Sequence, residues 1–375
     1  MKVFFNALIV HLFFNVYVFA RGWKILPENK AFKKSYIALF ALELLVYLIG
    51  FIFNTSLPSA ILKLILLIGT SWMILIGYIA GLLLLYDLLV LLGKKVAKIR
   101  SLNLGELKKR RISFVTFVSL VVLAMGYGSY RFWHPVASEY TISVNKEVPN
   151  LDTLRVVMVA DIHTGYLINK KVLDMYVDRI MEQKPDIILF VGDIIDYNLA
   201  PLIDQCLHEP FRRLKAPYGV YASTGNHEYR LNAEEKIAWL SNKAGLTVLR
   251  DTAIKIDDRF YLVGREDDKY PIRKPLSTIM KDVDKTLPII VMNHEPKNLQ
   301  EESSQKVDVA LYGHTHNGQL FPYNLFINLF YEVGHGYKKK EDTHVYVTSG
   351  LGLSGPQYRI GTISEVVVLN VVFAQ

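Results

Sequence analysis

The sequence contains a single cysteine, Cys206, in 375 residues. One thiol cannot form an internal disulfide framework, and it cannot provide the ligands of a thiolate metal site or an iron–sulfur cluster. It does not identify the compartment either, because one unpaired thiol is tolerated on both sides of a membrane. Internal repeats and low-complexity tracts are also lacking, and the 51% hydrophobic content excludes a disordered chain.

Acidic residues are scarce in the first 133 positions. This part holds 16 Lys and Arg against 4 Asp and Glu, a net charge of +12, whereas residues 134–375 hold 27 against 31, a net charge of −4. The overall charge of +8 and the pI of about 9.2 therefore arise in the first part alone. Because the second part is acidic, the basic balance does not indicate nucleic-acid binding, and we expect no nucleic-acid partner.

Long apolar stretches dominate the same basic part of the chain. Each approaches or exceeds the roughly 20 residues that a helix needs to cross a bilayer. The third is longer than one crossing, so we expect its membrane part to end near Tyr86. We predict a four-span transmembrane helical bundle over residues 1–133, with spans at 4–20, 36–53, 61–92 and 112–130.

The charges of the connections predict the orientation of this anchor. Five basic residues lie in the first connection, residues 21–34, and eight in the third, residues 94–111, whereas residues 54–59 carry no charge. The positive-inside bias puts the first and third connections in the cytoplasm and everything after residue 130 on the outer face. We therefore expect a multi-pass protein of the inner membrane with an extracytoplasmic domain.

Two alternatives to this topology remain open. Val18 and Ala20 could end a cleaved signal peptide, but cleavage would leave the basic residues 21–34 outside, against the bias. The following domain could instead lie in the cytoplasm.

Glu43 and Asp87, in or near spans, are functional candidates by default. The simpler interpretation is that Glu43 faces another helix, protonated or paired, and that Asp87 lies at the cytoplasmic end.

Residues 141–375 have a different texture, in which short β-branched runs alternate with amphipathic helical segments at 171–183 and 233–242. This alternation predicts an α/β layered domain over 154–375, with residues 134–153 forming a connector and first strand. The basic run Lys338 to Lys340 reads as a solvated loop. The expected strands are 155–160, 187–191, 220–223, 260–263, 289–292, 309–312, 344–348 and 366–371.

Polar residues follow five of these strands directly. In open α/β sheets, ligands bind at the carboxyl ends of the strands, so the five groups can converge. Asp and His are ligands for borderline-hard divalent cations, and glycines before three of the groups let the chain turn sharply. One such group alone is weak evidence for a metal site, since an isolated His is more often a core or surface residue with ordinary hydrogen-bond partners. The groups are Asp161-x-His163, Gly192-Asp193-x-x-Asp196, Gly225-Asn226-His227-Glu228, His294 and Gly313-His314-x-His316.

This order of motifs resembles the signature of the calcineurin-like metallophosphoesterase superfamily over about residues 154–370. The segment Gly-His-Thr-His-Asn-Gly-Gln is followed by Ser349-Gly350-Leu351-Gly352 and Arg359-Ile360-Gly361. These segments are similar to those of the bacterial membrane-anchored or exported branch. Some members of that branch or its neighbours act on lipid A precursors or other envelope phosphates. The resemblance implies two packed β-sheets flanked by helices, whereas the four-span front end is not part of the superfamily fold.

The resemblance also implies roles for individual residues. His227 would protonate the leaving-group oxygen or donate to phosphoryl oxygens, and Asp196 and Glu228 would support the motif. The cofactors would be two divalent cations. A shell of carboxylates and imidazoles accepts Mn²⁺, Fe and Zn, and of these we favour Mn²⁺. Asp161, His163 and His316 would hold the first metal, Asn226, His294 and His314 the second, and Asp193 would bridge them.

The predicted function is that of a membrane-anchored binuclear metal-dependent phosphoesterase. It would hydrolyse a phosphodiester, phosphomonoester or pyrophosphate bond by attack of a metal-bridged hydroxide, with an envelope lipid as one candidate substrate. The alternative is a non-catalytic membrane sensor or transport-associated protein; the intact His227 favours the enzyme, because metal binding alone does not need it.

Three further features leave the mode of substrate binding open. The apolar run 320–331 forms an acyl-contacting, membrane-dipping lip, or it packs as core of the sheet edge or on the membrane helices. His335 and Arg359 either bind a non-transferred phosphate or are ordinary surface residues.

Overall fold

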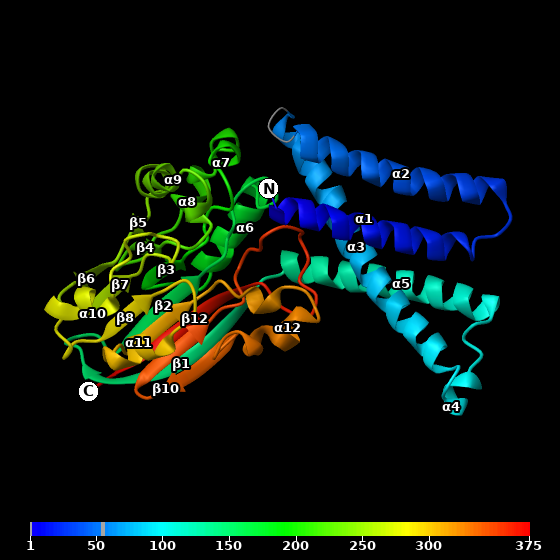
Figure 1. Cartoon of the computed structure of the whole chain (residues 1–375). Coiled ribbons are helices and arrows are strands. Elements are labelled where there is room, and N and C mark those ends of the chain that lie inside the picture. Colours follow the sequence, from blue (N-terminus) through cyan, green and yellow to red (C-terminus); the bar gives the residue numbers. More distant parts are fainter. Residues whose placement is uncertain (1, 54–56) are drawn as a thin grey trace. The chain divides into compact units, whose positions relative to one another are not determined.

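The computed structural model describes the backbone of residues 2–53 and 57–375 (Figure 1). Side chains of residues 2–8, 51, 53, 97 and 100 are outside this description, and so are residues 54–56 of the uncharged connection predicted at 54–59. The chain forms two compact units, Met1–Tyr127 and Gly128–Gln375. We call them unit 1 and unit 2 and treat each by itself.

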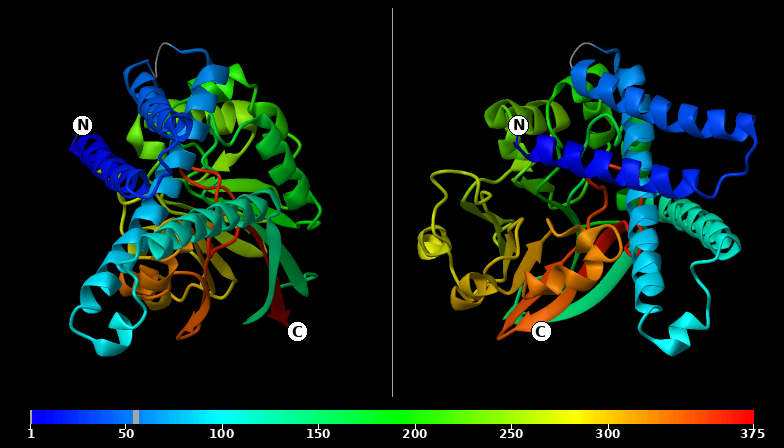
Figure 2. Two further views of the ribbon diagram at one scale, coloured as in Figure 1. Left: turned by 90° about the vertical axis from the view of Figure 1, so that its right-hand side faces the viewer. Right: turned by 45° about the vertical axis from the view of Figure 1, so that its right-hand side comes forward.

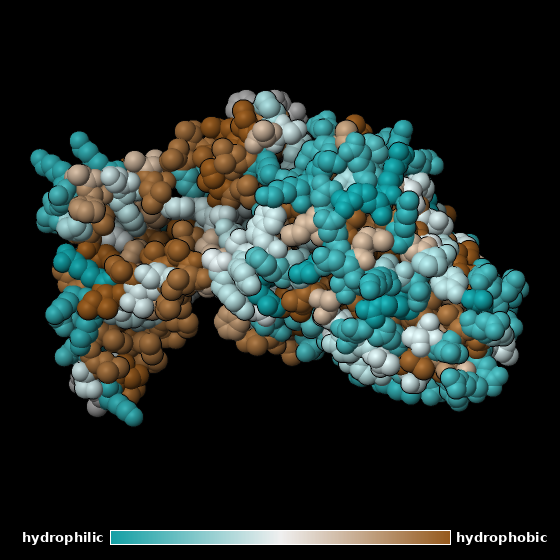
Figure 3. All heavy atoms as spheres, turned by 180° about the vertical axis from the view of Figure 1, so that it is seen from behind, coloured by the Kyte–Doolittle hydropathy of each residue, from teal (hydrophilic) through white to brown (hydrophobic). Residues whose placement is uncertain are grey.

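Unit 1 is helical, as its long apolar stretches predict. The third apolar stretch forms one helix of 34 residues, so its backbone shows no break near Tyr86. Hydrophobic side chains cover much of the helical surface (Figure 3). The helices are α1 (Lys2–Trp23), α2 (Lys30–Phe53), α3 (Ser59–Leu92), the short α4 (Ala97–Arg100) and α5 (Leu107–Trp133), whose last turns belong to unit 2.

Two of these helices, α3 and α5, are long and apolar enough to cross a membrane by length and composition. The sequence predicted four spans, and α1 and α2 are not among the candidates found in the described residues. Side chains at the start of α1 and at the end of α2 lie outside the described residues. Two membrane-spanning candidates are therefore found, not four.

The two acidic residues singled out in the apolar helices are both paired. Glu43 is buried, and its Oε1 lies 2.9 Å from His11 Nε2 of α1. Asp87 accepts hydrogen bonds from Arg21 and, at 2.6 Å, from the Tyr17 hydroxyl. Glu43 thus faces another helix and has a partner, as the simpler interpretation expected.

Unit 2 consists of two six-stranded mixed sheets flanked by helices (Figures 1 and 2). Sheet 1 has the spatial order β1 (Val136–Glu147), β12 (Glu365–Ala374), β2 (Thr153–Val159), β3 (Ile187–Val191), β4 (Val220–Ser223) and β5 (Thr247–Val248). Sheet 2 has the order β10 (Gly336–Lys340), β11 (Thr343–Val347), β9 (Val309–Tyr312), β8 (Ile289–Met292), β7 (Phe260–Gly264) and β6 (Thr252–Ile256).

Short helices and turns connect the strands. The helices are α6 (Lys170–Met181), α7 (Ala200–Asp204), α8 (His208–Phe211), α9 (Ala233–Trp239), α10 (Leu276–Ile279), α11 (Leu299–Ser304) and α12 (Tyr323–Phe326). The 3-10 helices are η1 (Glu228–Arg230), η3 (Met280–Asp282), η4 (His316–Gly318) and η5 (Ile327–Leu329), and η2 (Leu240–Ala244) is a π-helix.

The alternation of side chains along the strands builds the layers. Val156 and Met158 of β2 face the core between the two sheets, where they join Leu262 of β7 and Leu311 of β9. The intervening side chains of β2 and β3 point the other way, into a second core with helices α6 to α9. Helices α10 and α11 cover the outer face of sheet 2. Successive side chains of a strand point to opposite faces of the sheet. A strand such as β3, which has a core on each side, therefore consists entirely of apolar residues.

The predicted α/β layers are confirmed, and each of the eight expected strands is present. The sequence missed β5, β6 and β10. Lys338 to Lys340 were read as a solvated loop, but they lie in β10, which pairs with β11 at the edge of sheet 2. An edge strand exposes its side chains, and lysines there prevent pairing with other chains, so such a strand is polar in sequence.

The apolar run 320–331 lies on the surface of unit 2. Tyr323 and Leu325 of α12 are 70% and 62% exposed, and Leu329 and Phe330 are each 76% exposed. The alternative that this run packs as core is therefore wrong for these side chains.

Candidate metal centre

The carboxyl ends of β2, β3 and β4 in sheet 1 and of β8 and β9 in sheet 2 deliver the predicted site residues to one place. Backbone hydrogen bonds tie the loops together. Asp161 N donates to Gly192 O at 3.1 Å, and His163 N donates to Asp193 O at 2.9 Å. The loops that follow β2 and β3 are therefore bound to each other by their backbones.

Five of the predicted ligands have left-handed backbone, a conformation that non-glycine residues rarely adopt. Such strain persists only where the surrounding structure fixes it, and it concentrates at functional sites. The φ values are 57° for Asp161, 53° for His163, 53° for Asp193, 70° for His314 and 50° for His316. The fold thus accepts a local cost in free energy that places these side chains together.

Glycine is required where the loops pass closest to the ligands. A Cβ at Gly225 would lie 2.3 Å from Asp193 Oδ1. A Cβ at Gly192, where φ is +75°, would lie 2.4 Å from His294 Nδ1. Both glycines therefore leave space that the ligand side chains occupy.

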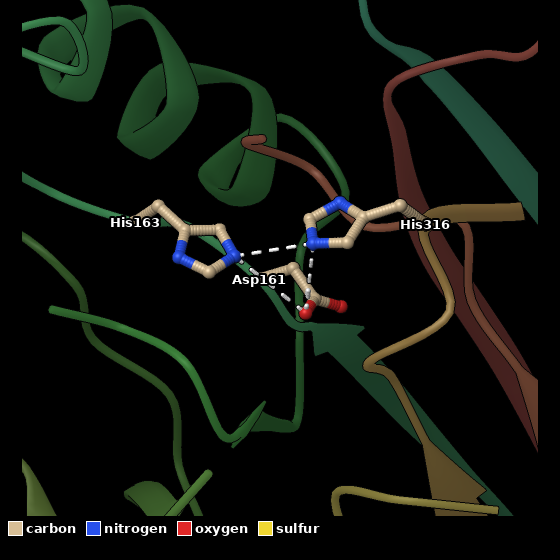
Figure 4. A group of neighbouring side chains, drawn as sticks. All are labelled: Asp161, His163 and His316. Atoms are coloured by element: carbon tan, nitrogen blue, oxygen red, sulfur yellow. Dashed lines mark hydrogen bonds and ion pairs between the residues drawn. The ribbon is translucent and has the colours of Figure 1, made fainter. Parts of the chain in front are cut away.

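Asp161, His163 and His316 form the first cluster (Figure 4). His163 Nε2 and His316 Nε2 are 3.2 Å apart, and Asp161 Oδ1 lies 3.8 Å and 3.4 Å from them, respectively. All three side chains are largely buried. These are the residues expected to hold the first metal.

Asp193, His294 and His314 form the second cluster. His294 Nε2 lies 3.2 Å from Asp193 Oδ2, and His314 Nδ1 lies 2.9 Å from Asn226 Oδ1. Asp193 also belongs to the surroundings of the first cluster, because its Oδ2 is 3.8 Å from His163 Nε2. The structure therefore brings all seven expected ligands together, with Asp193 between the two groups.

The donor atoms of the second cluster fit a bound cation. His294 Nδ1 lies 2.8 Å from the carbonyl oxygen of Val191 and donates to it. His294 Nε2 is therefore the ring nitrogen that faces the cluster, 3.2 Å from Asp193 Oδ2, and this buried atom has no hydrogen-bond partner among the described residues. A backbone acceptor that fixes the tautomer by taking the other ring N–H is usual for metal-binding imidazoles.

The charges of the site support the same conclusion. Burial lowers the pKa of His294, but the carboxylates of Asp193 and Asp161 outweigh it and hold that pKa well above its usual value. Burial acts against ionisation of Asp193 too, yet His294 holds the Asp193 pKa well below its usual value. The pair thus favours a positive charge between its members.

Burial acts against protonation of His163, but its hydrogen bond with Asp196 and the nearby carboxylates raise its pKa. His314 and His316 are instead kept neutral, the form that binds metal. Burial, together with the charge of His294, lowers the pKa of His314 to about 4. Burial and the neighbouring His163 lower the pKa of His316 well below its usual value. We infer that the residues present suit divalent cations.

His227 and Asp196 lie beside these clusters. His227 Nδ1 is 2.9 Å from both Oδ1 and the backbone oxygen of Asp196, which fixes the ring. His227 Nε2 lies 3.9 Å from Asp193 Oδ2 and faces the site. Although burial opposes it, hydrogen bonds from His163 and His227 hold the pKa of Asp196 well below its usual range. Asp196 thus carries the negative charge that orients His227.

Glu228 has a more definite role than the sequence indicated. Its fully buried carboxylate accepts backbone hydrogen bonds from Asp193, Ile194, Ile195 and Gly225, at 3.0, 2.9, 2.9 and 2.8 Å. One side chain therefore fixes the loops after both β3 and β4.

Lys236 and Arg359 are also fully buried next to the site. Lys236 Nζ donates to the carbonyl oxygen of His227 at 2.6 Å. Arg359 donates to the carbonyl oxygens of His316 and Gly350 at 3.1 and 2.9 Å. The sequence did not indicate Lys236. Arg359 is neither a surface residue nor a phosphate ligand, because its donors are directed at backbone inside the protein.

His335 also differs from both alternatives. Its Nε2 lies 3.0 Å from the Oε1 of Glu365, a carboxylate that is fully buried. This pairing, against the effect of burial, lowers the pKa of Glu365 to about 2. His335 is therefore a structural partner of a buried acid.

Glu228→Ala should destabilise unit 2 strongly. Four buried backbone N–H groups would lose their acceptor, and each unsatisfied group costs about 1 to 3 kcal/mol. We expect a loss of at least about 3 kcal/mol in unfolding free energy, measured by denaturant unfolding of the full chain in detergent. Glu235→Ala, which removes an exposed carboxylate of α9, is the matched control. Equal stability of the two variants would contradict the role of Glu228.

Comparison with known proteins places the site in a family. The family model for calcineurin-like phosphoesterases matches residues 154–318. An uncharacterized metallophosphoesterase of Helicobacter pylori (strain 26695) is 31% identical over 280 residues, which are 70% of this chain and 73% of the relative.

Two further relatives have similar identity. An uncharacterized metallophosphoesterase of Campylobacter jejuni is 32% identical over 61% of this chain and 62% of its own length. A transmembrane protein with metallophosphoesterase domain from Danio rerio is 32% identical over 64% of this chain and 58% of its own. The chain thus spans about three fifths of these two relatives. On the family match and the Helicobacter relative, the chain belongs to the calcineurin-like metallophosphoesterase family.

Proposed function

We propose that this protein hydrolyses a phosphoester or phosphoanhydride bond with the help of two divalent cations. One observation carries the proposal: five strand ends bring seven ligand-type side chains into two adjoining, largely buried clusters, and His227 lies next to them. A site that only binds metal does not require an oriented imidazole at its edge.

Each residue has a task in this proposal. Asp161, His163 and His316 would hold one cation, Asn226, His294 and His314 the other, and Asp193 both. When bound, such cations polarise phosphoryl oxygens and make water a nucleophile at neutral pH. His227, with its Nδ1 held by Asp196, keeps Nε2 available to give a proton to the leaving-group oxygen.

Metal dependence is the first test of the proposal. The protein stripped by a chelator should lack turnover of 4-nitrophenyl methyl phosphate, and added Mn²⁺ should restore it, with Fe²⁺ and Zn²⁺ compared in parallel. The readout is release of 4-nitrophenol. Absence of turnover with every divalent metal, despite measured metal binding, would favour the alternative of a non-catalytic sensor or transport-associated protein.

We further propose that the protein is a multi-pass inner-membrane protein and that unit 2 faces the outside. Helices α3 and α5, the transmembrane relative and the basic connections support this arrangement. The four-span form of the anchor rests on the sequence alone. A reporter enzyme fused after Gln375 should be active only on the extracytoplasmic side, and activity only in the cytoplasm would reverse the orientation.

A lipid is the substrate class that we favour. Only two residues separate α5, a membrane-span candidate, from β1, so an α5 that crosses the membrane would keep unit 2 close to the bilayer. The exposed apolar segment 321–330 follows the loop of His314 and His316, and its neighbour Tyr331 donates to Glu295 Oε1 at 3.4 Å. The same oxygen is 3.4 Å from His314 Nε2. Acyl chains lying on this segment would therefore lie close to the metal ligands.

Replacing Leu329 and Phe330 together by Ser should remove a preference for long acyl chains. Two substrates with one leaving group make the comparison, 4-nitrophenyl dodecyl phosphate and 4-nitrophenyl methyl phosphate. Because apolar burial of such side chains is worth about 1.5 to 3 kcal/mol each, turnover of the dodecyl ester should fall at least about tenfold. Turnover of the methyl ester should not change.

Ile272→Ser is the matched control, since Ile272 is 71% exposed and lies outside the 321–330 segment. If the double variant and this control act alike on both esters, the segment does not bind acyl chains.

A further inference from the structure

A second candidate site lies entirely in unit 1. A pocket of about 210 Å³ opens between the end of α1, the later part of α3 and the start of α5. This volume is many times the roughly 15 Å³ that one water molecule requires. The three elements come from distant parts of the sequence, so the pocket is a feature of the folded anchor.

The charge of the pocket is positive. Arg21, Lys24 and Arg110 line it together with one acidic residue, Asp87. Arg21 is paired with Asp87, and the Nε of Arg110 is buried without a hydrogen-bond partner among the described residues. Leaving a guanidinium donor unpaired in a buried position costs free energy, so its retention here indicates a missing acceptor.

The pocket lies at the end of the helices that carries the basic connections. Arg21 and Lys24 lie at the start of the first connection, and Arg110 lies near the end of the third. Around the charged groups the lining is apolar, with Ile25, Leu83 and Phe114. A basic pocket between apolar helices suits a ligand with an anionic head and an apolar remainder.

We propose that this pocket binds a phosphate group, such as the head group of an anionic phospholipid. Arg110 would use its unpaired donor for a phosphate oxygen, since a guanidinium group matches phosphate geometry. Lys24, which is exposed at the pocket, would add a second positive charge. This site is distinct from the metal centre, and it does not depend on the proposed hydrolysis.

Native mass spectrometry of the full chain, released from micelles with added lipid, tests the proposal. The wild-type protein should retain phosphatidylglycerol in preference to phosphatidylcholine. Arg110→Gln should reduce the retained phosphatidylglycerol about tenfold, the effect of losing one charged hydrogen bond. Lys24→Gln should reduce it in the same direction, and because Lys24 is exposed this variant does not threaten folding.

Lys108→Gln is the matched control, because Lys108 is an exposed cation near the start of the same helix and does not line the pocket. Addition of sn-glycerol 3-phosphate identifies the source of the phosphate. Displacement of the lipid means that a soluble phosphate is accepted too, and lack of displacement means that the apolar chains are needed. Equal retention of the two lipids, or equal losses with Lys24→Gln, Arg110→Gln and Lys108→Gln, would overturn the proposal.

Discussion

Asp193→Ala should lose both bound metal and at least about a thousandfold of the turnover of 4-nitrophenyl methyl phosphate. Asp193 is the carboxylate between the two clusters, 3.2 Å from His294 Nε2 and 3.8 Å from His163 Nε2. Its removal leaves His294 directed at an empty space, and it also removes the Oδ1 that accepts from the His227 backbone N–H at 2.8 Å. Metal content after dialysis, by mass spectrometry of the elements, and release of 4-nitrophenol are the two measurements.

Two further variants make this result specific. Asp193→Asn keeps the shape of the side chain but not its charge, so it separates loss of a ligand from a failure to fold. Asp342→Ala removes an exposed carboxylate of unit 2 and should behave as the wild type. Full metal content with full turnover in Asp193→Ala would exclude the bridging role.

His227→Ala should keep its metal and lose about 10² to 10⁴-fold in turnover, the usual contribution of a positioned acid. The structure holds His227 Nδ1 against Asp196 and directs Nε2 at the site, so its loss removes a proton donor. The defect should be larger for an ester with an alkyl leaving group than for a 4-nitrophenyl ester, because 4-nitrophenolate leaves without protonation.

The metal content of the same variant distinguishes an acid from a ligand. If His227→Ala releases metal during dialysis, His227 is a ligand, and the assignment of the acid is wrong. Asp196→Asn should show a weaker form of the same leaving-group dependence, since it disturbs the orientation of His227 and leaves Nε2 in place. His208→Ala, which replaces a histidine of α8, is the control for histidine loss.

The sequence predicted the location of the site because strand ends are visible in it. A run such as Ile187 to Val191 is buried on both faces, and the first polar residues after it lie at the edge of the sheet. The same reasoning holds for β2, β4, β8 and β9. The motifs then predicted which residues meet, and the structure brings them together.

The supports of the site were harder to predict. Glu228 acts through backbone N–H groups, which every residue has, so no pattern of side chains indicates its partners. Arg359 was expected either to bind a phosphate or to lie at the surface, because arginine is rarely buried, but carbonyl oxygens of Gly350, Gly352 and His316 accept its hydrogen bonds inside the protein. Short edge strands such as β5 and β10 lack the apolar runs that make a strand recognisable.

The position of β12 in sheet 1 has a kinetic consequence. It lies between β1 and β2, and it pairs Val136 with Glu365 across almost the whole of unit 2. Contacts this distant in sequence close slowly during folding. Until β12 arrives, β2 lacks one of its two neighbouring strands, and β2 is the strand that carries Asp161 into the site. We therefore expect the metal centre to be completed late in folding, when the final strand of the sequence has entered the sheet.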